Sequence, residues 1–156
     1  MDAIIRLQNE FINVQKNLSF GCHISPTHKT KNTLDWMHWE GQIFYDGLFY
    51  QIELTFTKKY PQVPPQVKFI SPVFNPNVYS RGQVCLDIIQ NKWKPSMSVT
   101  DVMKGLIQLL KYPNPSSPAN EIAAKLFVKD VAKFNEKVRE VARETKYKIR
   151  SYWIDE

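Results

Sequence analysis

Apolar and polar residues alternate strictly over residues 50–57, and this pattern limits the fold more than any other feature of the chain. The apolar members are Tyr50, Ile52, Leu54 and Phe56. Because successive side chains of a strand point to opposite faces, the pattern predicts a strand with one buried and one solvent-facing side. Shorter candidate strands at residues 22–25, 36–40 and 67–70 complete a predicted four-stranded antiparallel sheet.

Apolar residues with helical spacing occur both before and after these strands in the sequence. The first stretch repeats apolar residues at Ile4, Leu7, Phe11, Val14 and Leu18. Further on, Ser98 with Asp101 in the first turn predicts the start of a second helix. Ser117 followed by Pro118 predicts another start, with serine as the cap, and a break near residues 129–130 divides that last segment. With 156 residues, 43% of them hydrophobic, the chain fits one α+β domain spanning residues 1–156.

Regular periodicity disappears over residues 71–98, and the chain's second cysteine, Cys85, lies in this stretch. Irregular segments of this length inside a compact domain are usually functional or disordered, and its apolar residues predict that this one packs. A lone cysteine between apolar neighbours is by default a small buried hydrophobe. Polar residues nearby, Asn75, Asn77, Arg81 and Asp87, favour a reactive thiol instead. The residues alone leave both interpretations open.

Charge and cysteine content exclude several classes of protein. The net charge of +6 favours acidic partners only in a general way. Cys22 and Cys85 are the only cysteines, and no Cys or His spacing typical of a metal site occurs, so we expect no metal, no cofactor and no disulfide framework. We interpret His23, His28 and His38 as structural or surface residues. The opening MDAIIRLQNEF lacks a signal-peptide pattern, and no apolar run could span a membrane, so we expect a cytoplasmic or nuclear location.

The segment FNPNVYSRGQVCLDIIQNKWKP resembles the active-site segment of the ubiquitin-conjugating enzymes, in which a His-Pro-Asn turn precedes the catalytic cysteine and a tryptophan and proline follow it. The proline-rich segment after Tyr60 and the sequence PNPSSP resemble two further motifs of the family in the same order. The resemblance implies the UBC fold: an amino-terminal helix, a four-stranded antiparallel sheet, the active-site loop and carboxy-terminal helices. QNKWKP and YPNPSSPAN are most similar to the branch linked to DNA damage tolerance and histone ubiquitination.

This resemblance implies an ATP-dependent acyl transfer. An activating enzyme would pass ubiquitin to Cys85 as a thioester, and a lysine of a protein substrate would then attack it, usually with a ligase, of RING type, present. Asn77 is the implied oxyanion donor, although a turn residue bonding its own backbone is the alternative. Asp87 and Ser117 match positions that line the lysine approach. The alternatives are that Asp87 only anchors the loop and that Ser117 only caps a helix.

Asn75 departs from the family, which usually has histidine at this position before Pro76. The histidine is thought to brace the loop, and asparagine, which both donates and accepts hydrogen bonds, can replace it in that role. The family's ligase contacts map to Arg6, Pro61, Gln62, Pro95 and Ser96. The absence of a bulky aromatic residue at Gln62 implies a narrower choice of ligase.

Four other functions remain open from the sequence. The chain could be an inactive interaction module of the same fold, an enzyme for a ubiquitin-like modifier, a cysteine hydrolase or a nucleic-acid-binding domain. No histidine is placed as the base of a hydrolase. The only basic pattern is a four-residue repeat formed by Lys125, Lys129, Lys133 and Lys137, which predicts a solvated helical face paired with neighbouring acids. We therefore expect no direct nucleic-acid partner.

Overall fold

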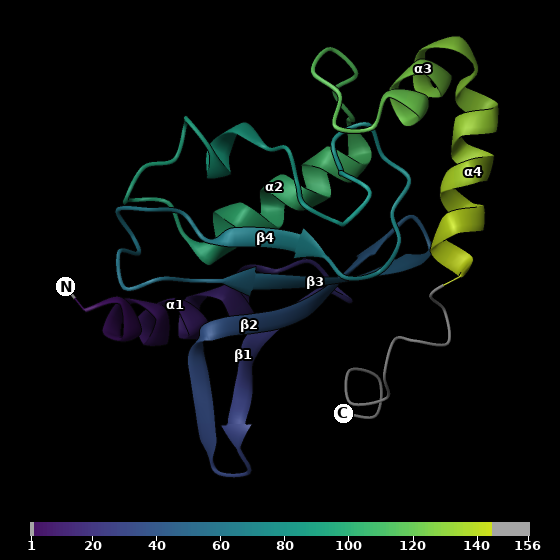
Figure 1. The fold of residues 1–156 in the computed structure, drawn as a ribbon. Coiled ribbons are helices and arrows are strands. Elements are labelled where there is room, and N and C mark those ends of the chain that lie inside the picture. Colours follow the sequence, from purple (N-terminus) through teal and green to yellow (C-terminus); the bar gives the residue numbers. More distant parts are fainter. Residues whose placement is uncertain (1, 145–156) are drawn as a thin grey trace.

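The computed structural model describes residues 2–144, in which a four-stranded antiparallel sheet is preceded by one α-helix and followed by a short 3-10 helix and three α-helices (Figure 1). The strands, in spatial order, are β1 (His23–Thr30), β2 (Thr33–Tyr45), β3 (Leu48–Thr55) and β4 (Gln66–Phe69). The helices are α1 (Ala3–Asn17), the short 3-10 helix η1 (Asp87–Ile89), α2 (Val99–Lys111), α3 (Glu121–Lys129) and α4 (Val131–Arg143). The predicted α+β architecture is confirmed. The predicted domain also includes residues 1 and 145–156, which lie outside the described residues.

The β2–β3 hairpin forms the centre of the sheet and is longer than the alternation predicted. Its two turn residues, Asp46 and Gly47, both have positive φ angles, of 52° and 77°. An Asp-Gly pair tolerates this geometry, which matches the twist of the flanking strands. Pairing therefore continues from Tyr45 opposite Leu48 down the ladder. Strand β2 extends well beyond the predicted residues 36–40 because cross-strand pairing does not require strict alternation.

Burial follows the strand periodicity on the inner face of the sheet. Trp39, Ile43, Ile52 and Leu54 are completely buried, as are Val102 and Leu106 of α2, which belong to the same apolar cluster. Figure 1 shows α2 above β4, α1 at the left near β2, and α3 and α4 together at the right. Among the helices of residues 2–144, none combines the length and apolar character needed to cross a lipid bilayer.

Two predicted helix boundaries are confirmed by their caps. The Ser98 side chain accepts from the backbone N–H of Asp101, whose carboxylate accepts from the backbone N–H of Ser98, and this capping box starts α2. Asp130 donates its backbone N–H to Leu126 at the end of α3 and caps α4 through its carboxylate. The predicted break near residues 129–130 thus separates two helices.

The predicted helix start at Ser117 and Pro118 is wrong. Helix α3 begins at Glu121, and Asn120 caps it through its side-chain oxygen. The backbone N–H groups of Ala119 and Asn120 both donate to the carbonyl of Pro76, at 2.8 and 3.0 Å. This carbonyl comes from the loop that contains Cys85, so a long-range contact delays the helix by one turn.

Candidate active site

A small antiparallel turn positions Cys85. Val78 pairs with Val84 in an isolated bridge, and the backbone N–H of Cys85 donates to the carbonyl of Asn77 at 2.8 Å. The turn passes through Gly82, whose φ angle is +94° and whose added Cβ would lie 2.0 Å from the Phe69 carbonyl oxygen. A residue with a side chain does not fit there. The backbone of Cys85 is therefore fixed relative to Asn77.

The two cysteines differ in access. Cys22 is buried, with 7% exposure, and its thiol donates to the carbonyl of Phe44 at 3.8 Å. Cys85 is partly exposed. The residues after it pack onto α2, where an added Cβ at Gly105 would lie 2.9 to 3.0 Å from the ends of Ile88 and Leu86. Among residues 2–144, Cys85 is thus the thiol that a macromolecule can reach, as a reactive cysteine requires.

Asn75 is buried, with 3% exposure, and forms two hydrogen bonds. Its side-chain oxygen accepts from the backbone N–H of Asn77 at 2.8 Å, and its amide donates to the carbonyl of Leu109 at 3.3 Å. In a continuing helix that carbonyl would accept from residue 113, but Pro113 has no N–H. Asn75 therefore satisfies an orphan carbonyl of α2 and joins the helix to the loop.

Asn77 is clamped to a second loop. Its amide donates to the carbonyl of Asn114, and its side-chain oxygen accepts from the backbone N–H of Asn114, both at 2.7 Å. The side chain thus bonds a different loop. The alternative interpretation, in which Asn77 bonds its own backbone, does not describe this arrangement. One N–H of the amide has no partner among residues 2–144. That proton is available to another acceptor.

The predicted lysine-approach residues, Asp87 and Ser117, are both exposed. Asp87 is the first residue of η1, and its carboxylate lies 3.2 Å from Lys92 Nζ. Both side chains of this ion pair are more than half exposed, so the pair contributes little to stability. Ser117 lies in the segment that Pro76 holds through two hydrogen bonds. Neither side chain packs into the hydrophobic core.

A buried carboxylate joins the segments that the resemblance assigns to ligase contacts. Glu10 is 6% exposed; one oxygen accepts from the backbone N–H of Val99 at 2.6 Å, and the other accepts from the Tyr60 hydroxyl at 2.5 Å and from Arg6 at 2.7 Å. Burial, followed by the bond to Glu10, raises the pKa of Tyr60 above its ordinary value. Arg6 also donates to the carbonyls of Pro95 and Met97.

This network leaves only part of the predicted ligase surface accessible. Pro61 is buried, and its carbonyl accepts from the Trp93 indole at 2.7 Å, so it supports the neighbouring segments, and its contact with a ligase stays a prediction. Gln62, Pro95 and Ser96 are exposed. They lie on segments tied together through Arg6 and Glu10.

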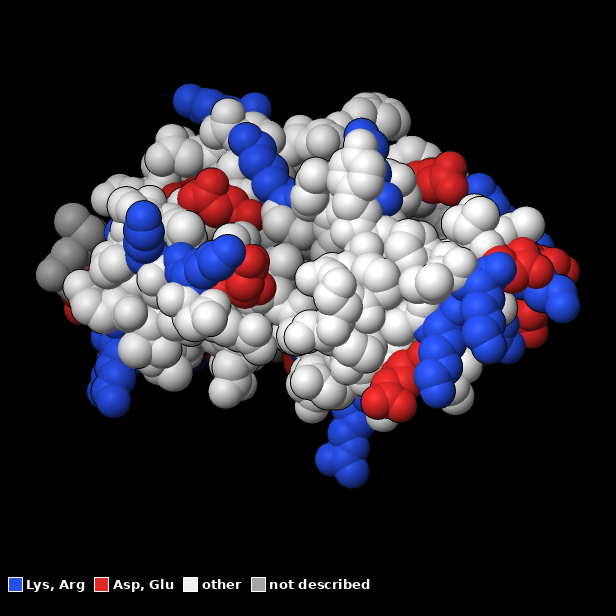
Figure 2. Space-filling view, turned by 90° about the horizontal axis from the view of Figure 1, so that it is seen from above, with Lys and Arg blue, Asp and Glu red and all other residues white. Residues whose placement is uncertain are grey.

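The lysine repeat does not form one helical face. Asp130 separates α3 from α4 and so divides the set Lys125, Lys129, Lys133 and Lys137 into two pairs. Lys137 pairs with Glu140 at 3.6 Å, in line with a solvated surface. Figure 2 shows Lys and Arg interspersed with Asp and Glu around an uncharged area on the face seen from above. At the right of this view several Lys and Arg side chains lie side by side, with Asp and Glu next to them.

Sequence reasoning missed three groups that the structure brings together. Asn114 and Glu10 were not singled out, because their partners lie 37 and 89 positions away. The third group is His38, Glu40 and Glu53 on neighbouring strands. The alternation of His38 and Glu40 along one strand was its only sequence signal.

Comparison with known proteins gives one consistent result. The sequence profile described as "Ubiquitin-conjugating enzyme" matches residues 6–142. The chain is 40% identical over 146 residues to "Ubiquitin-conjugating enzyme E2 3" of Arabidopsis thaliana, covering 90% of this chain and 94% of that protein. It is 37% identical over 147 residues to "Ubiquitin-conjugating enzyme E2 1" of Caenorhabditis elegans, covering 90% and 73%. A match to "Ubiquitin-conjugating enzyme E2 2" of Mycosarcoma maydis has 42% identity over 113 residues, covering 72% of this chain and 57% of that protein.

Proposed function

The chain belongs to the ubiquitin-conjugating enzyme family, and we propose that it carries ubiquitin as a thioester on Cys85. Ubiquitin-conjugating activity is the function of the family and of the relatives named above, and it implies ubiquitin, an activating enzyme and ligases as partners. The observation that carries the assignment to Cys85 is its access: it is partly exposed in a fixed loop, whereas Cys22 is buried.

The proposed reaction has two acyl transfers. In the first, the Cys85 thiolate attacks the thioester between ubiquitin and the activating enzyme, and the enzyme's thiol leaves. In the second, a neutral lysine amine attacks the new thioester carbonyl, the C–S bond breaks, and the amine loses its proton as the amide forms. Because the lysine pKa is normally near 10.4, this step needs a site that disfavours the ammonium form.

We assign Asn77 as the oxyanion donor of the second step. Its free amide proton supports this role, and the clamp to Asn114 holds the amide before the reaction begins. Such a donor contributes roughly 3 to 4 kcal/mol to transition-state stabilisation in other enzymes. Asn75 and Pro76 act indirectly, by holding the loop that carries Asn77. The Asn75 side chain forms two hydrogen bonds, and the Pro76 carbonyl accepts two more.

Asp87 and Ser117 are proposed to guide the incoming lysine. Both are exposed, and Asp87 carries the negative charge that attracts an ammonium group. Ser117 is neutral and orients the amine without attracting it. Phosphorylation at Ser117 would add about two negative charges.

The finer assignments rest on the sequence motifs. QNKWKP and YPNPSSPAN support the branch linked to DNA damage tolerance and histone ubiquitination, with protein substrates in the cytoplasm or nucleus. Arg6, Gln62, Pro95 and Ser96 support a RING-type ligase surface, because the Glu10 network holds their segments in one arrangement.

The test is incubation with activating enzyme, ATP and either ubiquitin or a ubiquitin-like modifier, followed by gel analysis with and without reductant. We expect an adduct with ubiquitin that reductant removes. An adduct only with a ubiquitin-like modifier would reassign the substrate. No adduct with either would favour an inactive interaction module.

A further inference from the structure

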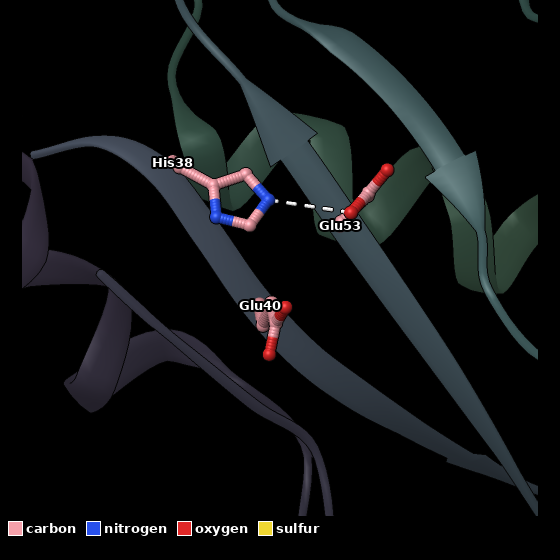
Figure 3. Close-up of side chains that lie close together, drawn as sticks. All are labelled: His38, Glu40 and Glu53. Carbon is pink, nitrogen blue, oxygen red and sulfur yellow. Dashed lines mark hydrogen bonds and ion pairs between the residues drawn. The ribbon is translucent and has the colours of Figure 1, made fainter. Parts of the chain in front are cut away.

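The outer face of the sheet carries a cluster of potential metal ligands. His38 and Glu40 lie on β2 and Glu53 on β3, and their ligand atoms all lie within 4.8 Å of one another. Figure 3 shows the His38 ring and the Glu53 carboxylate directed toward each other, with Glu40 beside them. Trp39 and Ile52, which alternate with these residues, are completely buried on the inner face. The cluster is therefore separate from the core.

The His38 ring is oriented by Thr27 of the neighbouring strand β1. The Thr27 hydroxyl donates to the His38 carbonyl at 3.1 Å and lies 3.2 Å from His38 Nδ1. A carbonyl cannot donate, so when the hydroxyl proton is used there, Nδ1 carries the hydrogen of the second contact. In a neutral ring the lone pair is then on Nε2, which lies 3.2 Å from a Glu53 carboxylate oxygen. Two acceptors then face each other, and either a proton on Nε2, which gives an imidazolium ion pair with Glu53, or a metal cation can join them.

The two carboxylates also lie close to each other. Glu40 and Glu53 are directly opposite each other in the antiparallel register of β2 and β3. Like charges in this position are destabilising. A divalent ion would neutralise both carboxylates and bond the nitrogen lone pair at the same time.

We propose that His38, Glu40 and Glu53 bind a divalent transition-metal ion, with zinc as the best fit. One imidazole and two carboxylates form a nitrogen and oxygen ligand set that suits Zn²⁺, with water as a fourth ligand. Tetrahedral ligands at zinc bond lengths lie about 3.3 Å apart. The His38–Glu53 separation of 3.2 Å matches this value, and the ligand atom of Glu40 lies within 4.8 Å of both. This departs from the expectation that the chain has no metal site.

Lys68 is the rival occupant. It lies opposite Glu53 in the register of β3 and β4, so its ammonium group is a competing counterion for that carboxylate. An ammonium group has three N–H donors and can donate hydrogen bonds to the same ligand atoms, but it forms no coordinate bond with them. Binding of Zn²⁺ itself therefore decides between the two.

The test is titration of the full chain with Zn²⁺ alone, in competition with a chromogenic chelator. The accessible Cys85 thiol is first alkylated with iodoacetamide so that it does not bind zinc. We expect one zinc ion per chain, with affinity reduced at least tenfold in His38→Asn and in Glu53→Gln. Thr27→Val should reduce affinity about tenfold because it removes the group that orients the ligand. His28→Asn, on the exposed part of β1, is the matched control and should bind like the parent.

Two further readouts depend on the site itself. In ¹⁵N NMR spectra at neutral pH, the neutral His38 ring should carry its proton on Nδ1, and zinc should shift the Nε2 signal. Zinc should also raise the thermal midpoint of the parent but not of His38→Asn, since a ligand that binds only the folded state stabilises it. No zinc binding in the micromolar range, or equal affinity in parent and His38→Asn, would overturn the proposal.

Discussion

Asn75→Ala tests how the active-site loop is held. The substitution removes both side-chain hydrogen bonds and leaves the Asn77 backbone N–H and the Leu109 carbonyl without partners. Leu109 cannot recover a helical partner, because residue 113 is proline. Asn75 is 3% exposed, so bulk water does not replace the lost groups directly.

The expected loss follows from those two groups. Leaving a buried polar group unpaired costs about 1 to 3 kcal/mol. A cavity of about 110 Å³ borders Asn75, and water entering it relieves part of the loss. We expect the free energy of unfolding to fall by about 2 to 4 kcal/mol. For a chain of this size that lowers the thermal midpoint by roughly 5 to 15 °C.

Activity should fall with stability. The Asn75 bond positions the backbone of Asn77, and small misplacements of catalytic groups slow reactions strongly. Single-turnover discharge of the Cys85 thioester to free lysine should slow about tenfold or more. Asn75→His should retain near-parental values, because neutral histidine both donates and accepts and the adjoining cavity leaves room for its ring.

Asn17→Ala is the matched control. It removes an exposed asparagine whose amide donates to the Asn13 carbonyl at 2.7 Å, and it should change neither the thermal midpoint nor the discharge rate appreciably. If Asn75→Ala equals the parent in both measurements, the side chain braces nothing and the reasoning fails.

Three further predictions concern other parts of the molecule. Asn77→Ala should slow single-turnover discharge roughly 100-fold or more, and should lower the thermal midpoint because the backbone of Asn114 loses both partners; an unchanged rate would leave Asn77 with only its structural role. Glu10→Gln should lower the unfolding free energy by about 1 to 3 kcal/mol in urea titrations, and an unchanged midpoint would contradict the role of its buried network. Burial, and secondarily the charge of Asp46, raise the pKa of Tyr50 to about 12, and the pKa of Tyr60 is raised too. Since the unfolded chain loses these protons first, stability should decline as pH rises above about 10, and constant stability up to pH 11 would refute this.

The local parts of the fold were predictable from the sequence. The alternation over residues 50–57 predicted the buried face of β3, and Ser98 with Asp101 predicted the start of α2. In both cases the responsible interactions connect residues a few positions apart. The Asp130 cap between α3 and α4 is of the same kind.

The parts that escaped prediction depend on contacts between distant segments. Ser117 was expected to start a helix, but the Pro76 carbonyl takes the N–H groups that an earlier start would use. The clamp between Asn77 and Asn114 joins residues 37 positions apart. The His38 and Glu53 cluster depends on the register of β2 and β3, which a pattern within one strand does not specify.

The most direct test of the central claim is the chemistry of the ubiquitin adduct in Cys85→Ser. With activating enzyme, ATP and ubiquitin, the parent and a Cys22→Ser control should both give an adduct that reductant removes. Cys85→Ser should instead give an oxygen ester that survives reductant, because an alcohol is a poorer leaving group than a thiol. A reductant-sensitive adduct that persists in Cys85→Ser, or disappears in Cys22→Ser, would contradict the assignment of Cys85.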